Sequence, residues 1–551
     1  MSLASLSGIF GNAASGMRSA QAQLDIVSRN VSNAGTAGYT RKEAPLQTLV
    51  ADGSAYGVTA GEVTRSVSRS LLQELRAGES IAAQLAVAED FLAKLELSFG
   101  TPGDESSIAT AVGKIGDSFR DLINEPNSST LQQQVLQRAK NFATSANALS
   151  ETIQSLRSDA DSLIASAAET FNVTVRELAE LNRSIAGLRG LGKSTADLED
   201  RRDALLKSLA ELVDIRTFER PTGEIVVTMR SGREILDAGV GQLSFNPTPV
   251  ISPDMELSAG DLSPVLLDGN DISAEIKSGR LRGLLDIRDK TMVDTQAQLD
   301  ELTARIAQNL ALADLDLFSY GAIRPVITSV TAGATLAKGA TTLTVSSAAG
   351  LTVGMNLRFA NHPTTYRVTA IVGLDVTIAP ATGAGTGADT EVPSGTRMVF
   401  AEPPGTAANG FSRIVGVNPA VISAPWRLRD GTSVATIGSI AQNNAIPRAV
   451  VDSFERVQPF GTGAGSSGLT LTGYAGSLIV AQATAKNGAS EALQARERLN
   501  EQFERRYSGE SAVNVDRELA LMLEIQNSYA ASAKVLTAAR QLMDELLAMM
   551  R

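Results

Sequence analysis

The two ends of the chain carry the clearest hydrophobic pattern. Apolar residues recur there at alternating spacings of three and four, which is the seam of a coiled coil. The seam of the first helix, expected over residues 1–33, includes Leu3, Leu6, Phe10, Met17, Leu24 and Val27. The seam of the last helix includes Leu519, Met522, Tyr529, Leu536, Met543 and Leu547. We predict that the two helices pack together, because each has one apolar stripe to bury.

The two terminal helices differ in their intrinsic stability. Asn514 is a suitable N-cap for the last helix, and acidic residues follow in its first turn, where the helix dipole favours them. The first helix contains three glycines, Gly8, Gly11 and Gly16, and each costs about 1 kcal/mol relative to alanine. The first helix should therefore be marginal alone and need a partner.

Between the ends, long helical segments alternate with segments rich in strand and turn residues. The helical pattern covers residues 66–214, 281–313 and 475–507, with breaks at 100–103, 124–127 and 187–192. Residues 130–185 contain neither glycine nor proline, which predicts one or two very long helices. Strands are expected within 40–64, at 224–229, and at 342–346, 366–370 and 375–378.

This alternation predicts a mainly α, multidomain protein with β inserts that project outward from a long helical bundle. We expect a terminal coiled-coil domain (1–45 with 510–551), a helical domain (46–214, 276–322 and 400–509) and two β inserts (215–275 and 323–399).

Composition narrows the possible functions. Hydrophobic residues make up 43% of the 551, which excludes wholesale disorder. The net charge of −11 and the lack of a basic cluster argue against nucleic acid as a partner. The absence of cysteine excludes disulfides and thiolate chemistry. There is no apolar run long enough for a membrane span and no secretory signal at the start, so only a specialised export route could place this chain outside the cell.

Two glycine motifs match nucleotide-binding patterns by letter but lack the required context. Gly187 to Ser194 matches the P-loop pattern, yet a charged amphipathic helix precedes it instead of a buried strand. Gly463 to Gly468 matches the dinucleotide fingerprint within a flexible, Gly/Ser/Thr-rich stretch. We interpret the first as a helix–loop–helix connection and the second as a loop, so no cofactor is expected.

Titratable residues give no catalytic or metal site. His362 is the single histidine, and we interpret it as part of a surface loop. The carboxylates Glu199, Asp200 and Asp203 are interleaved with Arg201 and Arg202, which is typical of a solvated, ion-paired helix face.

Residues 30–41 resemble the signature shared by bacterial flagellar rod, hook and hook-associated proteins. The matching positions are Asn30, Asn33, Thr36, Gly38 and Tyr39. Ala37 stands where that signature usually has proline, which loosens the turn slightly.

Three further stretches are similar to one family within that group, hook-associated protein 1. They are residues 196–206 running on to 212–214, residues 281–289, and residues 511–516, which include Asn514, followed by residues 527–537. The resemblance covers about 1–320 and 400–551 and leaves 325–400 as this chain's own elaboration.

The resemblance implies a structural subunit and no enzyme. Members of this family leave the cell through the flagellar type III export channel and form a ring on the distal end of the hook. The implied partners are further copies of the chain, the hook protein, the second junction protein and an export chaperone. The implied location is extracellular, at the hook–filament junction, and the terminal segments are expected to fold on assembly.

Three alternatives stay open at this stage. The chain could be another axial protein (hook, rod or second junction protein), although the long helices of 66–214 argue against hook and rod. It could be a nucleotide-binding enzyme that uses Gly187 to Ser194. It could also be an adhesin-like surface protein with the β inserts as binding modules.

Overall fold

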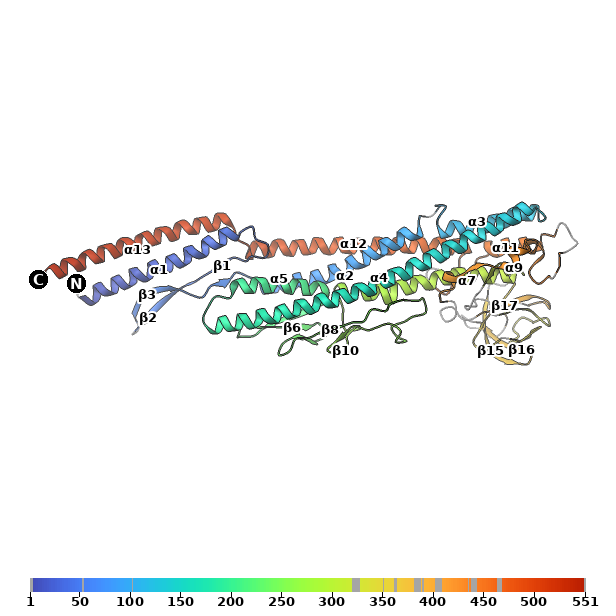
Figure 1. Cartoon of the computed structure of the whole chain (residues 1–551), viewed down its shortest axis with the longest axis horizontal. Coiled ribbons are helices and arrows are strands. Elements are labelled where there is room, and N and C mark those ends of the chain that lie inside the picture. The colour runs from blue at the N-terminus through green and yellow to red at the C-terminus, as the bar shows by residue number, and fades with distance from the viewer. Residues whose placement is uncertain are drawn as a thin grey trace.

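The helices and strands follow the expected order, and the mainly α fold with β inserts is confirmed. The computed structural model describes residues 3–51, 54–101, 103–319, 328–349, 351–360, 364–380, 388, 391–401, 409–434, 436–437, 443–462 and 468–549. Figure 1 shows a long, narrow molecule with both termini at one end and β15 to β17 at the other. Within the described residues no helix combines the length and apolar character needed to cross a membrane.

The terminal helices lie side by side, as the sequence predicted. The helix α1 (Leu3–Asn33) and the helix α13 (Val515–Met549) run in opposite directions (Figure 1). Asn514 caps α13, since its Oδ1 accepts from the backbone N–H of Arg517 at 3.0 Å. The helices are in contact along much of their length, which places residues near both ends of the sequence in one module.

A β-hairpin lies on the other side of α1. Its strands are β2 (Leu46–Ala51) and β3 (Ser54–Ala60), which pair antiparallel. Two serines of α1 bind the free edge of β3: Ser15 Oγ accepts from Val58 N at 3.2 Å, and Ser19 Oγ donates to Val58 O at 3.0 Å. A side chain at Gly57 would lie 2.5 Å from Ser15 Oγ, so only glycine permits this approach.

Four helices form the frame of the middle section, and their boundaries agree with the predicted breaks. They are α2 (Arg69–Phe99), α3 (Ile108–Asn124), α4 (Ser129–Gly190) and α5 (Ala196–Leu212). Ser107 and Ser128 cap α3 and α4 through their side-chain oxygens. The stretch without glycine or proline forms part of one helix, α4, of 62 residues.

The remaining helices pack against this frame. They are α6 (Arg280–Asp286), α7 (Met292–Leu312), α8 (Phe411–Ile414), α9 (Pro419–Ser423), α10 (Arg427–Asp430), α11 (Ala445–Glu455) and α12 (Leu471–Ser511). The helix expected over 281–313 is present as α6 and α7, which are joined by a π-helical turn, η1 (Ile287–Thr291), that the sequence did not predict. Within this turn Arg288 pairs with the buried Asp161 at 2.7 Å.

The β segments form small antiparallel sheets. Near α4 lie β5 (Ile215–Glu219), β6 (Ile225–Met229), β7 (Glu234–Leu236), β8 (Leu243–Ser244), β9 (Leu266–Leu267) and β10 (Asn270–Asp271), in the orders β5-β6-β7 and β10-β9-β8. The short strands β11 (Phe318–Ser319) and β18 (Gly416–Val417) also pair. Apolar side chains of β6 and β8 belong to the same core as the helices, so this insert is packed on the helical body.

A larger sheet lies at the far end and has its own core. Its order is β12-β17-β14-β15-β16-β13, from β12 (Thr328–Thr331), β13 (Thr342–Thr344), β14 (Asn356–Phe359), β15 (Thr365–Val372), β16 (Asp375–Pro380) and β17 (Arg397–Ala401). The strands expected within 325–400 are therefore present, and their buried residues form a cluster separate from the helical core.

Candidate assembly site

Asn30 lies at the centre of the contact between the two termini. The residue is fully buried near the end of α1, and its amide group makes four hydrogen bonds. The Nδ2 donates to Lys42 O at 2.9 Å and to Glu518 Oε2 at 3.0 Å. The Oδ1 accepts from Tyr39 Oη at 3.0 Å and from Lys42 N at 3.1 Å. All donors and lone pairs of the amide are thus satisfied, which fixes the loop after α1 onto α13.

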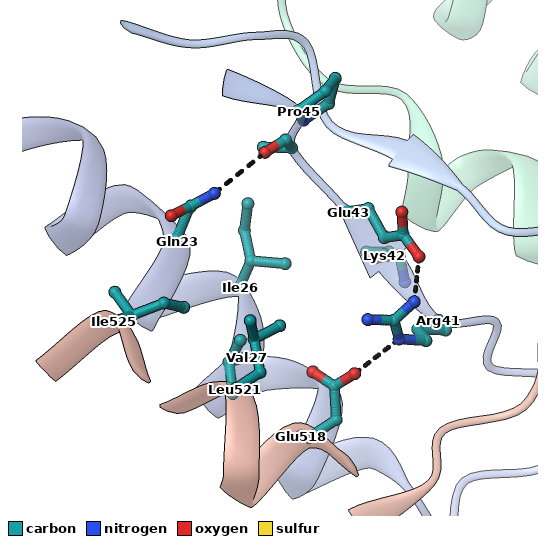
Figure 2. A pocket seen from close by; sticks show the side chains of 11 residues that line it. Gln23, Ile26, Val27, Arg41, Lys42, Glu43, Pro45, Glu518, Leu521 and Ile525 are labelled. Atoms are coloured by element: carbon teal, nitrogen blue, oxygen red, sulfur yellow. Dashed lines mark hydrogen bonds and ion pairs between the residues drawn. The ribbon is translucent and has the colours of Figure 1, made fainter. Parts of the chain in front are cut away.

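Glu518 is the matching residue on α13. Its side chain is fully buried, and Oε1 accepts from Arg41 Nε at 2.6 Å. Figure 2 shows Arg41 between Glu518 and Glu43, with ion pairs to both. These residues, with Ile26, Val27 and Ile525 among others, line a small cavity of about 140 Å³ between the terminal helices and β1 (Lys42–Glu43). Two signature segments from opposite ends of the chain therefore meet through one buried carboxylate.

A second cluster joins this region to the helical body. Arg65, on the short strand β4 (Thr64–Arg65), reaches three carboxylates of α5: Glu199 at 2.9 Å, Asp200 at 2.9 Å and Asp203 at 2.8 Å. The side chains of these four residues are only 10–16% exposed. Here the structure corrects the interpretation of these carboxylates as a solvated helix face. They form a shielded ion-pair network with a residue far away in the sequence.

Lys42 connects the two clusters, which together we call the joint (Asn30, Tyr39, Arg41, Lys42, Arg65, Glu199, Asp200, Asp203 and Glu518). Its Nζ contacts Asp197 at 2.6 Å and Asp200 at 3.0 Å, and it lies 3.5 Å from the centre of the Tyr39 ring. Thr40 Oγ1 also donates to Asp200 Oδ1 at 2.6 Å. The loop after α1 is consequently held to α5 by charge-assisted bonds, which are the stronger kind of hydrogen bond.

The joint shifts the pKa of two of its groups in opposite directions. Burial alone would raise the pKa of Glu199, but the hydrogen bond from Thr195 and the charge of Arg65 outweigh it and lower the pKa below its ordinary 4.5. Burial alone would lower the pKa of Lys42, but its hydrogen bonds to Asp197 and Asp200 raise the pKa above its ordinary 10.5. The charged form of both residues is therefore favoured by the folded joint.

The joint should be most stable between about pH 4.5 and 10.5. Because the folded pKa of Glu199 is lowered, its contribution is present above the unfolded pKa and is lost as the pH falls through the folded value. Because the folded pKa of Lys42 is raised, its contribution is present below the unfolded pKa and is lost as the pH rises through the folded value. Hydrogen-exchange protection factors measured from pH 7 to pH 3 should fall at residues 39–43 before they fall in α4. Simultaneous loss in both segments would contradict this expectation.

The contact between α1 and α13 contains part of the predicted seam. Ala20, Val27 and Ile525 form a small buried apolar cluster between the two helices. Leu24 on α1 and Leu521, Met522 and Tyr529 on α13 are half-buried and pack against it. The seam residues Met17, Leu536 and Met543 are half-buried elsewhere on the two helices. The side chains of Leu3, Leu6 and Leu547 lie outside the described residues.

Two of the predicted seam residues lie outside this contact. Phe10 is 44% exposed and Leu519 is 45% exposed. Glu518 lies in the interface in place of Leu519, because its carboxylate binds Asn30 and Arg41. Ile525 and Ala539 are likewise buried, whereas the alternating pattern indicated the next residues, Gln526 and Arg540. The structure thus moves one of the two stripes of the α13 seam by one residue and keeps the other, at Met522, Tyr529, Leu536 and Met543. The role of these residues in assembly stays a prediction.

The other signature residues have local roles. Asn33 Nδ2 donates to Arg29 O at 2.9 Å, and Asn33 Oδ1 accepts from Thr36 Oγ1 at 3.4 Å. Gly38 has a φ of +78°, a conformation that residues with a side chain rarely adopt. Tyr39 contributes its hydroxyl to Asn30, as described above. Sequence reasoning missed Arg65, Lys42 and Glu518, whose partners are distant in the chain.

The remaining motifs give no second site. Gly187 to Ser194 connects α4 to α5 with no strand before it, which confirms the helix–loop–helix interpretation. His362 and the core of the Gly463 to Gly468 motif lie outside the described residues. Among the residues that the structure does describe, no group of histidine, aspartate and glutamate side chains is arranged to hold a metal ion.

Comparison with known proteins first defines the class. A profile described as "Flagella basal body rod protein" matches residues 10–40. A second, described as "Flagellar basal body rod FlgEFG protein C-terminal", matches residues 505–549. These two segments contain most of the two terminal helices and, of the joint, Asn30, Tyr39 and Glu518. The chain is a flagellar protein of the rod and hook class.

The middle of the chain identifies the family within that class. A profile described as "Flagellar hook-associated protein FlgK helical domain" matches residues 92–311. Flagellar hook-associated protein 1 of Escherichia coli is 23% identical over 98% of this chain and 100% of its own length. The Bacillus subtilis protein of that name is 25% identical over 39% of this chain and 46% of its own. The chain belongs to the family of flagellar hook-associated protein 1.

A solved structure supports the fold. The flagellar hook junction protein FlgK from Burkholderia pseudomallei aligns with a TM-score of 0.50 at 15% identity. The alignment covers 79% of this chain and 99% of that one.

Proposed function

We propose that this chain is a structural subunit of the ring that joins the flagellar hook to the filament. The observation that carries the proposal is the module of α1 and α13, which Asn30 and Glu518 hold together and the joint connects to a long helical body. The proposed location, between hook and filament, rests on the relatives named above. The proposed partners are further copies of the chain, the hook protein, the second junction protein and an export chaperone.

We also propose a division of the chain into domains. We propose an inner domain of 1–45 and 510–551, a helical domain of 46–214, 276–322 and 400–509, and β inserts at 215–275 and 323–399. The hairpin of β2 and β3 contacts α1, so it accompanies the inner domain in space. The second insert has a core separate from that of the helical body, which supports its treatment as a domain of its own.

Assembly is proposed to couple folding of the terminal helices to incorporation after export by the flagellar type III system. The contact between α1 and α13 leaves most of its apolar side chains only half-buried, as at Leu24, Met522 and Tyr529. Burying one side chain of this size is worth about 1.5–3 kcal/mol. Neighbouring subunits that cover this seam would therefore supply the free energy that orders the two helices.

A charged residue in the contact between α1 and α13 should abolish incorporation of the protein into the flagellum and leave the helical body folded. Val27→Asp places an unpaired carboxylate at a buried position against Ile525. We expect no motility on soft agar, with an unchanged melting transition of the helical body in the purified protein. Ser28→Asp, one residue further on the exposed face of α1, is the matched control and should remain motile. Normal filaments in the Val27→Asp strain would contradict the proposed role of the terminal pair.

We propose that the chain is not an enzyme. The P-loop-like stretch lies between two helices, where backbone N–H groups have no strand to direct them at a phosphate. Isothermal titration of the purified protein with Mg·ATP should show no binding, and measurable heat of binding would reopen the nucleotide-binding alternative.

Deletion of the gene in its host tests the proposed function itself. We expect bare hooks in electron micrographs and flagellin lost to the medium. Missing hooks would assign the chain to the hook or rod, and intact filaments would overturn the flagellar role.

A further inference from the structure

The terminal module, by which we mean α1, α13 and the strands β1 to β4, shares no apolar core with the helical body. Its apolar cluster is formed by Ala20, Val27 and Ile525, whereas the large cluster of the body begins at Phe91. Among the residues that the structure describes, no apolar cluster contains members of both parts. Close-packed apolar side chains fix the relative position of two elements by their shapes, and the joint lacks this source of rigidity.

Three short segments outside the helices and strands connect the two parts. They are residues 34–41 after α1, residues 66–68 before α2, and residues 512–514 between α12 and α13. Two hydrogen bonds tie the first two segments to the end of α12. Arg41 N donates to Ser511 O at 2.8 Å, and Ser66 Oγ donates to Glu510 O at 3.2 Å. All three segments therefore meet at the end of α12.

Two cations of the terminal module face a row of carboxylates on α5. Lys42 and Arg65 lie directly opposite each other on the paired strands β1 and β4, so their side chains lie on the same side of this ribbon. Asp197, Asp200 and Asp203 are spaced by three, which makes them neighbours on the surface of α5. Lys42 pairs with the first two, and Arg65 pairs with the last two and with Glu199.

A displacement of the terminal module by one helical turn towards the start of α5 keeps both cations paired. One turn corresponds to about 5.4 Å. After this step Arg65 faces Asp197 and Asp200, and Lys42 keeps Asp197, which it already contacts at 2.6 Å. Neither cation is left without a carboxylate, which is the costly outcome for a shielded charge.

The carboxylates that Arg65 leaves behind have partners of their own. Asp203 also pairs with Arg76 at 2.7 Å, and Glu199 also pairs with Arg189 at 3.2 Å. A step in the opposite direction meets Lys207, about one turn beyond Asp203, whose positive charge repels Arg65. The row of carboxylates therefore permits the step in one direction only.

Two open cavities border the contact and leave room for this movement. One, of about 610 Å³, is lined by residues 36–40 together with parts of α2, α5 and α12. The other, of about 530 Å³, is lined by residues 62–65 together with parts of α2, α5 and β5. Both cavities reach Arg76 and Asp203. The ion pairs thus lie beside space that side chains do not fill, so a displacement does not require a packed interface to be broken.

We propose that the joint is an articulation with two positions. The terminal module pivots about the end of α12, and Lys42 and Arg65 exchange carboxylates along α5 by one helical turn. Movement of one element past another by a turn, between two discrete sets of contacts, is one of the recognised types of switching transition. The inference goes beyond the proposed function, because it concerns the single chain and does not depend on its place in the flagellum.

Distances between two spin labels test the articulation, and the natural chain has no cysteine that would take up a label. Ser28→Cys on α1 and Ser162→Cys on α4 are exposed positions on the two sides of the joint. Because α5 begins on the side of the terminal module (Figure 1), the step lengthens the molecule. Double electron–electron resonance should show two populations of distances that differ by up to about 5 Å.

Two reference pairs measure the width that the labels alone produce. Ser162→Cys with Ser184→Cys lies within α4, and Ser28→Cys with Ser528→Cys lies within the terminal module. Both references should give one narrow distance. A broad distance within the terminal module would mean that its helices order only on assembly. The same pairs are then measured in isolated hook–basal bodies, with the labelled chain diluted by the natural one.

Asp197→Asn removes the carboxylate that the second position requires. The side chain of Asp197 is 76% exposed, so its loss leaves the folded body intact. We expect the longer population of the Ser28–Ser162 pair to disappear. Glu177→Gln is the matched control, because Glu177 is a partly exposed carboxylate on α4 whose partner, Arg201 at 3.9 Å, lies outside the joint. Both populations should persist in this variant.

Three results would overturn the proposal. The first is a Ser28–Ser162 distance as narrow as the references. The second is a pair of populations that persists in Asp197→Asn, because the second position would then not use this carboxylate. The third is an equal loss of the longer population in Glu177→Gln. The proposed function fails by a different result, intact filaments after gene deletion, so the two failures are distinguishable.

Discussion

Asn30→Ala is expected to abolish assembly of the protein into the flagellum. The substitution leaves four hydrogen-bonding groups without their partner, including the buried carboxylate of Glu518 and both backbone groups of Lys42. Each unpaired buried group costs about 1–3 kcal/mol, more for a charged one. The loop after α1 would therefore detach from α13. Soft-agar motility and the amount of the protein in isolated hook–basal bodies measure the effect.

The matched control for this prediction is Asn33→Ala. Asn33 is the same residue type in the same signature, but its side chain bonds only to the nearby Arg29 and Thr36. We expect motility close to that of the natural protein. A similar loss in both variants would show that the signature acts through the turn as a whole and not through the amide of Asn30.

Arg65→Ala is expected to separate the terminal module from the helical body. Its removal leaves Glu199, Asp200 and Asp203 without their shared cation. Each carboxylate then keeps one separate partner: Arg189, Lys42 and Arg76, respectively. Removing one partner of a shielded ion pair costs about 3–5 kcal/mol. Small-angle X-ray scattering of the purified variant should show a broader distribution of interatomic distances, with unchanged helix content by circular dichroism.

Arg69→Ala is the matched control for Arg65→Ala. Arg69 is 78% exposed and has one ion pair, to Glu219 at 2.7 Å, which as a surface pair is worth less than about 1 kcal/mol. Its scattering curve should match that of the natural protein. An unchanged curve for Arg65→Ala would mean that other contacts determine the orientation of the terminal module.

Local patterns predicted most of the fold. The spacing of apolar residues and the glycine and proline breaks indicated the helices and their limits, because these depend on neighbours in the sequence. The phase of α13 was wrong at Leu519 because a buried glutamate replaced the leucine that the pattern favoured. The π-helical turn escaped prediction, and the ion pair of its Arg288 with Asp161 links positions 127 residues apart, which a local pattern does not contain.

The residues of the joint were likewise only partly predictable from the sequence. The signature resemblance pointed to Asn30 and Tyr39, but Asn30 binds Glu518 from the opposite end of the chain, and Lys42, which contacts the Tyr39 ring, pairs with Asp200 of α5. Glu199, Asp200 and Asp203 have the same local pattern whether water or Arg65 lies opposite them. Burial of charge is decided by tertiary contacts, which periodicity along one helix does not contain.

The length of α4 has a mechanical consequence. At about 1.5 Å per residue, its 62 residues form a rod about 90 Å long that extends from the side of the joint towards the far sheet (Figure 1). A continuous ladder of backbone hydrogen bonds resists bending, and no glycine or proline interrupts residues 130–185. A force applied at the terminal module would therefore reach the outer end through one stiff strut, with little lost to internal flexing.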